Sequence, residues 1–287
     1  MSIEDLTIVI TSFRSEKKIR ECLKHIDKGF KVVNVENSNN QEYKKKIETD
    51  FQNVSCILSG ENLGYAKANN IGLKNTKTKY ALILNPDSRL SNQAIENFFH
   101  TAKKNPDFAM IGPSIISSYE KEKKNFVSTN LISAKSVRGH AMFLNLEQFK
   151  NVGFFDENFF IYLEEIDLCR RLINQGKKIF IDPTIEIFHE GGKSHDSSIN
   201  FEMELSRNWH WMWSQFYFEK KYNGYFSSLI KIFPRIFSAI FKTILYTLLL
   251  NKDKLLIYFY RLKGVTSAIL GQSSWYRPKI KNWLEMT

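Results

Sequence analysis

The stretch GFFDENFFIYLEEIDL, residues 153–168, constrains the fold of this chain more than any other. It sets several acids among phenylalanine, tyrosine, isoleucine and leucine side chains: Asp156, Glu164, Glu165 and Asp167. If a helix begins near Tyr162, the paired glutamates lie in its first turn, where the helix dipole favours anions. Helix capping would account for that position, but capping does not require two adjacent acids.

The residues after the acids continue with helical spacing. LEEIDLCRRLINQGKKI, residues 163–179, predicts one helix with a shared face. We expect that face to carry Leu163, Ile166, Arg170 and Ile173. The acids at the start of this helix then serve capping, chemistry or both, and the residues by themselves leave these alternatives open.

The wider pattern GxFDExFFxYxExxDLCxRxxxxGxxI, residues 153–179, resembles the acceptor-side motif of family 2 glycosyltransferases, especially their rhamnosyltransferase-like branch. In that family the second acid of a Glu-Asp pair takes the proton from the acceptor hydroxyl. The resemblance implies that Glu165 is this general base, that Glu164 is its substitute, and that Asp167 stands with them. Glutamate is one methylene longer than aspartate, yet either can bring a carboxylate within hydrogen-bond reach of a sugar hydroxyl. The resemblance also implies that Asp156 lies on the acceptor side.

The first part of the chain alternates between strand-like and helix-like segments. LTIVITSF, residues 6–13, is an apolar run typical of a buried strand, and EKKIRECLKHI, residues 16–26, has the spacing of an amphipathic helix. The alternation continues over residues 30–58. It predicts an α/β fold with a mixed, mostly parallel sheet flanked by helices and with ligands at the carboxyl ends of the strands. The resemblance implies the A-type glycosyltransferase fold with a helical C-terminal tail.

Polar residues follow several of the predicted strands, and taken singly each could be an ordinary turn. ENLGYAKANNIGLKNT, residues 61–76, matches the family signature Asn-x-Gly-aromatic-small-x-small-x-Asn-x-Gly. VENS, residues 35–38, resembles the family's Asp-Asn-x-Ser turn with glutamate in place of aspartate. The resemblance implies that the nucleotide sugar is bound by Thr11, Glu36, Asn37, Asn62, Gly64, Tyr65, Lys67, Asn70, Asp87 and Arg89.

A divalent cation is the cofactor that the resemblance implies. NPD, residues 85–87, ends a predicted strand, and its proline presents Asp87 just beyond the strand. Family members carry Asp-x-Asp here and hold Mg²⁺ or Mn²⁺ on the donor diphosphate, for which oxygen ligands are suited. The resemblance implies that Asp87 and His189 are the metal ligands. Because residue 85 is asparagine, Arg89 is an alternative partner for the phosphate.

Two glycine-containing loops complete the implied site. Gly139 and His140 stand where the family has a Gly-small pair on the acceptor side, although a lone histidine is more often packed or at the surface. HEGGKSH, residues 189–195, matches a His-x-x-Gly-x-Ser element through Gly192 and Ser194, and its glycines and Lys193 could close over phosphates. His195 is a weaker candidate in the same loop.

Charge is distributed unevenly along the 287 residues. The formal net charge is +11, and from Trp209 onward twelve lysines and arginines face three acids, which assigns +9 to this segment and +2 to the rest. A basic, aromatic segment indicates an anionic surface as partner, and its apolar content favours a membrane over nucleic acid. Pro234, Arg235 and Lys242 interrupt its apolar runs, so about twenty consecutive apolar residues are missing.

These features predict a catalytic domain over residues 1–208 and a membrane-associating helical tail over residues 209–287. Helices that simply pack on the catalytic domain are the alternative interpretation of the tail. Cys22, Cys56 and Cys169 are widely spaced, which argues against a disulfide framework or zinc site. The N-terminal residues lack the basic and small-residue features of a signal peptide. We expect a protein of the cytoplasm, peripheral on the inner face of the cell membrane.

The function implied is inverting transfer of a sugar, with rhamnose as one candidate, from a nucleotide-diphosphate donor to a glycan acceptor. A lipid-linked acceptor in cell-surface polysaccharide synthesis would explain the tail. The alternative is a catalytically weakened protein that binds a sugar nucleotide or a glycan, motivated by Asn85 and Glu165. A nucleotidyltransferase is a third possibility, but the N-terminal region lacks a glycine-rich phosphate loop.

Overall fold

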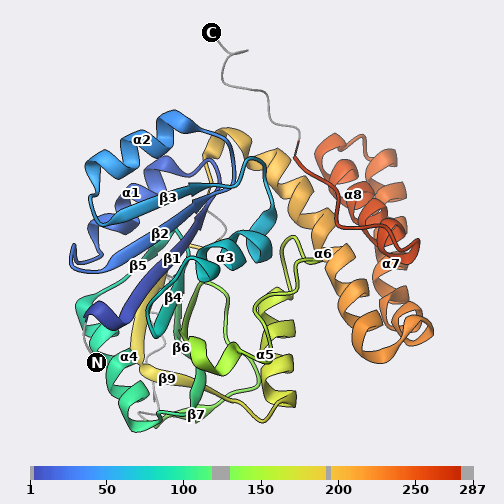
Figure 1. Ribbon diagram of the computed structural model, residues 1–287. Coiled ribbons are helices and arrows are strands. Elements are labelled where there is room, and N and C mark those ends of the chain that lie inside the picture. The colour runs from blue at the N-terminus through green and yellow to red at the C-terminus, as the bar shows by residue number, and fades with distance from the viewer. Residues whose placement is uncertain (1–2, 118–129, 192–194, 279–287) are drawn as a thin grey trace. The chain divides into compact units, whose positions relative to one another are not determined.

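The computed structural model describes residues 3–117, 130–191 and 195–278. The chain divides into two compact units. Figure 1 colours the chain by residue number. The sheet unit comprises residues 1–156 and 165–196, and the helical unit comprises residues 157–164 and 197–287. The division predicted after residue 208 lies inside a helix of the second unit, so that helix begins earlier than the charge pattern suggests.

Within the described residues, the sheet unit contains one nine-stranded sheet. Its strands are β1 Leu6–Ser12, β2 Lys31–Glu36, β3 Val54–Leu58, β4 Tyr80–Leu84, β5 Ser88–Arg89, β6 Phe108–Ser117, β7 Ile132–Ser133, β8 Ala141–Asn145 and β9 Lys178–His189. They are ordered β3-β2-β1-β4-β8-β6-β9-β5, and β7 pairs with β9. The β1–β4 region and the β6–β9 pair are parallel, whereas β8 is antiparallel to both its neighbours. The predicted mixed, mostly parallel sheet is confirmed.

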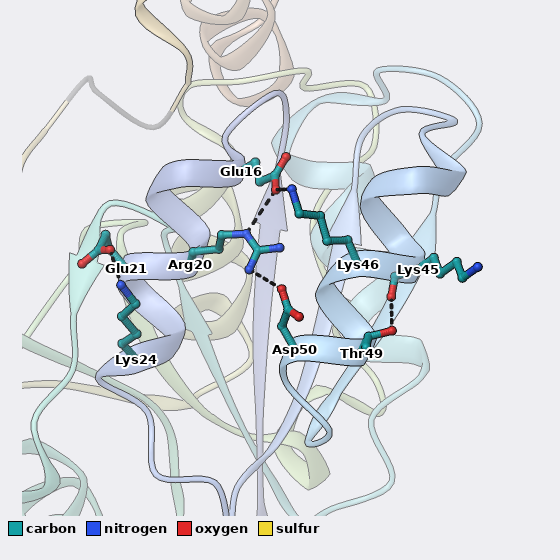
Figure 2. A network of polar contacts seen from close by, with 8 residues as sticks. All are labelled: Glu16, Arg20, Glu21, Lys24, Lys45, Lys46, Thr49 and Asp50. Carbon is teal, nitrogen blue, oxygen red and sulfur yellow. Dashed lines mark hydrogen bonds and ion pairs between the residues drawn. The ribbon is translucent and has the colours of Figure 1, made fainter.

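Five helices accompany these strands: α1 Glu16–Lys24, α2 Gln41–Asp50, α3 Gly64–Lys74, α4 Asn92–Lys104 and α5 Glu164–Asn174. Short 3-10 turns cover Ile3–Asp5 and Leu146–Phe149. Figure 2 shows the polar network that joins α1 to α2: Arg20 lies 3.1 Å from Glu16 and 2.6 Å from Asp50, and Lys46 lies 3.1 Å from Glu16. Such surface pairs contribute little stability each, so the two helices are held mainly by their buried apolar faces.

The buried face of α5 is not the face that was predicted to carry Leu163, Ile166, Arg170 and Ile173. Ile173 is 40% exposed, whereas Leu168, Cys169 and Leu172 are fully buried. The predicted face assumed a helix that begins near Tyr162. In the structure the helix packs with its Leu168, Cys169 and Leu172 side buried instead. The prediction of the helix itself is confirmed.

The last strand also differs from expectation. The sequence KKIFIDPTIEIFH, residues 177–189, predicts two short strands, because its apolar runs lie on either side of Pro183, but β9 is continuous. Its register with β6 jumps from Pro113–Asp182 to Ser114–Glu186, so an irregularity around Pro183 joins two short ladders. This is how a residue without an N–H is accommodated in a strand. The sequence SVRGHAMFLN, residues 136–145, also predicts a strand, which begins only at Ala141. A further strand that KNFVST predicts over residues 124–129 lies outside the described residues.

The sheet unit is held by an aromatic core. Phe143 on β8 stacks on Tyr80, Phe98 and Phe108 with ring centroids 5.0–5.6 Å apart. Small residues are needed where α3 meets β1, since a Cβ on Gly72 would lie 2.3 Å from Val9 Cγ1. Gly72 of the family signature is therefore required for packing, and this contact fixes α3, the helix that carries most of the signature.

The helical unit contains α6 Asn200–Asn223, α7 Tyr225–Leu248 and α8 Lys252–Ile269, preceded by the 3-10 turn Ser197–Ile199. Its own core includes Trp209, Trp213 and Phe216 of α6, Ile232 of α7 and Val265 of α8. A Cβ on Gly264 would lie 2.1 Å from the carbonyl oxygen of Trp209, so α8 approaches the backbone of α6 closely. Trp209, Trp213 and Phe216 of α6 are thus core residues of this unit.

Helix α7 carries a continuous apolar stripe that this core does not cover. Its members recur every three or four residues and are each at least 44% exposed: Phe226, Ile230, Phe233, Phe237, Ile240, Phe241, Ile244 and Leu248. In the part of the chain that the structure describes, no helix combines enough length and hydropathy to span a bilayer. Because Ser228, Ile232 and Ala239 of α7 are buried, the exposed stripe is one face of an amphipathic helix.

Candidate active site

Glu36 ends β2 at the carboxyl edge of the sheet and is almost completely buried. Its carboxylate accepts hydrogen bonds from the hydroxyls of Ser12 and Ser38 and from the Arg14 backbone N–H. Burial raises the pKa of Glu36, and these hydrogen bonds oppose that rise. Glu36 therefore ties together the two loops that follow β1 and β2, around the predicted nucleotide position.

The asparagines of the signature brace the same loops. The Asn37 side chain donates to Gly64 O at 3.1 Å and accepts from Leu63 N at 3.2 Å, and Asn62 accepts from Gly64 N at 3.2 Å. Asn70 forms a matched pair with the backbone of Phe155, at 2.9 and 3.0 Å. Each of these amides forms a bond that shapes the loops around α3, and their contacts to the nucleotide sugar stay a prediction.

Asp87, beyond β4, lies beside His189 at the end of β9. The distance from His189 Nε2 to Asp87 Oδ1 is 3.2 Å, and Asn85 Nδ2 lies 3.5 Å from the same ring nitrogen. The rings of His189 and His140 stack with centroids 4.7 Å apart. Burial, reinforced by His189 and Arg138, lowers the pKa of His140 to about 4. His140 is thus a neutral imidazole at neutral pH and supports the ring of His189.

Several buried polar atoms at this edge have no hydrogen-bond partner within the described residues. They are Thr11 Oγ1, Ser15 Oγ, Ser88 Oγ and both carboxylate oxygens of Asp87. Leaving a buried polar group unsatisfied typically costs about 1–3 kcal/mol, so such atoms are rare in a finished core. These unsatisfied atoms gather at the carboxyl ends of β1 and β4, which makes this edge of the sheet a candidate binding site for a polar ligand.

The described residues contain no group of three or more histidine, cysteine, aspartate or glutamate side chains arranged to hold a metal. Asp87 and His189 do fit two positions of a divalent-cation site, because the carboxylate oxygens lack donors and the imidazole nitrogen lies next to them. A cation held there would need its remaining oxygen ligands from a bound molecule or from water.

Glu165 lies near Tyr65, a residue of the signature stretch 61–76, with Gly139 between them. The Tyr65 hydroxyl donates a hydrogen bond to Gly139 O. A Cβ built on Gly139 would lie 3.6 Å from the Tyr65 hydroxyl and 3.9 Å from the Glu165 carboxyl carbon. The three predicted site residues thus converge, although they are far apart in the sequence, and the absence of a side chain at Gly139 keeps space beside the carboxylate.

The electrostatics of Glu165 suit a proton acceptor. Burial raises its pKa, opposed by hydrogen bonds from backbone N–H groups at the start of α5. A raised pKa makes a carboxylate a stronger base once ionised, which is the direction that general-base catalysis requires. The backbone just before it is strained, since Tyr162 and Leu163 have φ values of 74° and 68°. Left-handed conformations cost roughly 1–2 kcal/mol for each such residue, and they are often kept at functional sites.

Asp167 has a different setting from Glu165. It is fully buried, and Arg171 Nε lies 2.8 Å from its carboxylate. Arg171 also donates to Val152 O and Phe154 O. Asp167 therefore holds the arginine that fastens the loop leading to Asp156, which gives it a positioning role in the described contacts.

The remaining predicted residues are placed less centrally. Arg89 is exposed, and its guanidinium carbon lies 5.2 Å from the centre of the Phe188 ring. Lys67 is half-buried on α3. Gly192, Lys193 and Ser194 lie outside the described residues, and His195, which follows them, is buried.

Sequence reasoning missed several residues that organise the site. Ser12, Arg14 and Ser38 surround Glu36, and Arg14 O accepts a hydrogen bond from Asp196 N at 2.8 Å. Lys18 of α1 forms a 2.6 Å ion pair with Glu190. These contacts bring the segment after β9 back over the β1–α1 loop. The ST-rich strand end TSFRS, residues 11–15, was the available signal, since polar residues after a buried strand gather at ligand sites.

Comparison with known proteins gives one family match. The model of glycosyl transferase family 2 matches residues 7–171. Two curated relatives are a low-salt glycan biosynthesis hexosyltransferase, Agl10, of Haloferax volcanii and a dTDP-rhamnosyl transferase, RfbF, of Shigella flexneri. The first is 26% identical over 65% of this chain and 67% of its own length. The second is 29% identical over 56% of this chain and only 60% of its own length.

A solved structure shares the fold. The mannosyltransferase PcManGT from Pyrobaculum calidifontis, solved with GDP-Man and Mn²⁺, has a TM-score of 0.58 at 12% identity. The match covers 94% of this chain and 88% of that one. The A-type glycosyltransferase fold predicted from the sequence is confirmed.

Proposed function

This chain belongs to glycosyl transferase family 2, in its rhamnosyltransferase-like branch, and on that premise we propose that it transfers a sugar from a nucleoside-diphosphate donor to a glycan hydroxyl with inversion. The observation that carries the proposal is the convergence of Glu165, Tyr65 and Gly139 in a sheet unit whose strand ends hold unsatisfied polar atoms. Glu165 supplies a base beside the space left by Gly139, and the unsatisfied polar atoms supply a binding surface for the donor.

The nucleotide occupies the carboxyl edge of β1, β2 and β4 in this proposal. Thr11 and Ser15 offer unsatisfied hydroxyls there, and Glu36 holds the surrounding loops in place. Ligands of open α/β sheets bind at such edges. Tyr65 is fixed by its bond to Gly139 and borders the position of the donor sugar.

Transfer is a single displacement. Glu165 takes the proton of the acceptor hydroxyl as its oxygen forms a bond to the anomeric carbon of the donor. The bond from that carbon to the diphosphate oxygen breaks, and the nucleoside diphosphate leaves with the electron pair. One displacement inverts the anomeric centre, and one positioned carboxylate is enough to move the proton.

Asp87 and His189 would hold a divalent cation against the donor diphosphate, and Mn²⁺ is the ion named with GDP-Man in the mannosyltransferase structure. When bound, such a cation offsets the charge that develops on the leaving group. His140, kept neutral by burial, holds the His189 ring in place for that role.

The apolar stripe of α7 supports peripheral attachment to a membrane. Lys231, Arg235 and Lys242 lie on the same helix, so the stripe combines apolar side chains with cations, as interfacial helices do. A basic residue near an anionic leaflet contributes on the order of 1 kcal/mol. An acceptor linked to a lipid would then reach the enzyme by diffusion in the plane of the membrane. Three buried free cysteines agree with the cytoplasmic side.

A second candidate is a weakened enzyme that binds its sugar nucleotide with little turnover. Asn85 favours it, because an amide near His189 replaces an acid that would strengthen a cation site.

A thermal-shift panel of nucleotides and nucleotide sugars, with and without Mn²⁺, tests the proposal. We expect stabilisation by one nucleoside diphosphate and its sugar, strengthened by Mn²⁺, and slow hydrolysis of that donor. Stabilisation without hydrolysis or transfer would favour the second candidate, and no response to any nucleotide would refute both.

A further inference from the structure

The helical unit contains a cavity of about 310 Å³ that is lined by none of the proposed active-site residues. It is lined by Tyr162, Glu204, Arg207, Asn208, Trp211 and Arg261. All six belong to the helical unit, and they come from the segment before α5, from α6 and from α8. The cavity is therefore a feature of that unit by itself.

The polar side chains of the cavity are fixed by one another. Asn208 is only 6% exposed, and its amide nitrogen donates to Glu204 O and Oε1, both at 2.8 Å. Its amide oxygen accepts from Arg261 Nε at 2.6 Å. Arg207 lies 3.0 Å from Glu204. Two cations and one anion thus form a network around a buried amide, with a net charge of +1 facing the cavity.

Arg261 is oriented by this network. Its Nε is bonded to Asn208 and its guanidinium lies 5.1 Å from the Tyr258 ring centre, but its terminal amino groups have no hydrogen-bond acceptor among the described residues. A planar guanidinium held in this way is suited to bind two oxygens of a phosphate.

The aromatic wall of the cavity is also arranged. The rings of Tyr162 and Trp211 meet edge to face with centroids 5.3 Å apart, and Trp211 is 37% exposed. Tyr162 holds this position with a left-handed backbone, a conformation that costs energy and is often kept at functional sites. An exposed indole beside fixed polar groups is suited to receive the apolar face of a ring that also carries hydroxyls.

We propose that this cavity binds a sugar phosphate, with the phosphate on Arg207 and Arg261 and the sugar ring against Trp211, and that it is a subsite for a phosphate-linked acceptor. Its assignment to the acceptor rests on the proposed function. Tyr162 precedes Glu165 by three residues, so chain geometry keeps their Cα atoms within about 11 Å. Arg261 also lies on α8, which packs against the amphipathic helix α7.

Binding of glucose 1-phosphate to the full chain, measured by calorimetry, tests the site. Arg261→Gln should weaken binding by about 10- to 100-fold, since it removes a charge-assisted contact to phosphate. Lys252→Gln, which removes one exposed positive charge from the same helix, should leave binding unchanged. Equal binding by the two variants would overturn the proposal.

A second variant guards against misfolding of the first. Trp211→Leu removes the indole without touching the hydrogen-bond network, and it should also weaken glucose 1-phosphate while leaving inorganic phosphate unaffected. If inorganic phosphate binds as tightly as glucose 1-phosphate, or if Trp211→Leu binds as the wild type does, the cavity is not a sugar-phosphate site.

Nucleotides separate the acceptor from the donor as the source of the phosphate. UDP and GDP should not displace glucose 1-phosphate, and Arg261→Gln should keep the nucleotide stabilisation of the wild type. Displacement by a nucleoside diphosphate would overturn the acceptor assignment. Binding of glucose 1-phosphate that depends on Arg261, in a chain that responds to no nucleotide, would refute the proposed transferase and leave the sugar-phosphate site standing.

Discussion

The sheet unit and the helical unit depart from ordinary burial in opposite ways. At the strand ends of the sheet unit, polar atoms such as those of Asp87 and Thr11 are buried without partners. On α7 of the helical unit, large apolar side chains such as Phe226 and Ile230 are exposed. Each departure is costly for the chain alone. Each supports a proposal made above: a polar ligand at the strand ends of the sheet unit, and a membrane surface on α7 of the helical unit.

This comparison also separates the chemistry from the delivery of its substrate. The groups proposed to move a proton and neutralise a leaving group lie in the sheet unit, while the membrane surface and the sugar-phosphate cavity lie in the helical unit. Changes in the first should alter turnover, and changes in the second should alter encounter with the acceptor.

The largest expected effect comes from removing the cation from the sheet unit. Chelation with EDTA, or Asp87→Asn, should lower glycosyl transfer by on the order of 10³–10⁴-fold, because several kcal/mol of transition-state stabilisation are lost. Transfer assays with Mn²⁺ added back after EDTA measure this. Full activity in EDTA would instead favour neutralisation of the leaving group by Arg89 or Lys193.

The second-largest expected effect comes from removing the proposed general base, Glu165. Glu165→Gln keeps the shape and hydrogen bonding of the side chain but removes its basicity, so kcat should fall by about 10²–10⁴-fold while nucleotide affinity is retained. Glu164→Gln is the matched control beside it. If the loss of turnover appears in Glu164→Gln and not in Glu165→Gln, the base has to be reassigned.

The membrane surface of the helical unit should respond to charge on the stripe. Phe233→Asp with Phe237→Asp should release the protein from anionic liposomes, since burial of each phenylalanine contributes about 1.5–3 kcal/mol, or roughly 10- to 100-fold in partitioning. Co-sedimentation measures this. High salt should release the wild type only partly, because the apolar contribution is not screened.

Ile173→Asp supplies the control for this experiment, because it places the same charge on an exposed apolar position of the sheet unit. It should sediment as the wild type does. A truncation after residue 208 is less informative, because it would cut α6 between Asn208 and Trp209. Wild-type protein that stays in the supernatant would mean that α7 binds something other than lipid.

The smallest expected effect is on stability. Burial raises the pKa of Glu165 in the folded chain, so its ionised form opposes folding, and stability falls as pH rises through the raised pKa. Glu165→Gln should therefore raise the unfolding temperature at pH 8, by about 2–4 °C for each kcal/mol relieved, and the difference should vanish below the ordinary glutamate pKa. Thermal unfolding from pH 4 to pH 8 measures it. The acid limb of wild-type turnover should also lie above the ordinary glutamate pKa.

The local pattern of the sequence was enough for most of the sheet unit. Alternating apolar strands and amphipathic helices predicted the β1–β4 region because strand and helix periods are local properties. Glu165, Tyr65, Gly139, Asp87 and His189 were named by the resemblance to family 2 glycosyltransferases and not by periodicity. Periodicity also left open which side of α5 is buried, because the orientation of a helix is set by the surface it packs on.

The sequence by itself determined the residue types and their order: acids in a helix start, an asparagine-rich turn after a strand, and a basic aromatic segment beyond residue 209. Only the tertiary structure decided which polar groups are used up within the protein and which are left for a ligand. Asn37, Asn70 and Asp167 form hydrogen bonds or ion pairs that brace loops. Trp209 and Trp213 of α6 form a core, while the apolar stripe of α7 stays exposed. The physical reason is that hydrogen bonds and buried contacts often join residues that are distant in the chain. The sequence shows which side chains can form them, but only the fold decides which side chains come together.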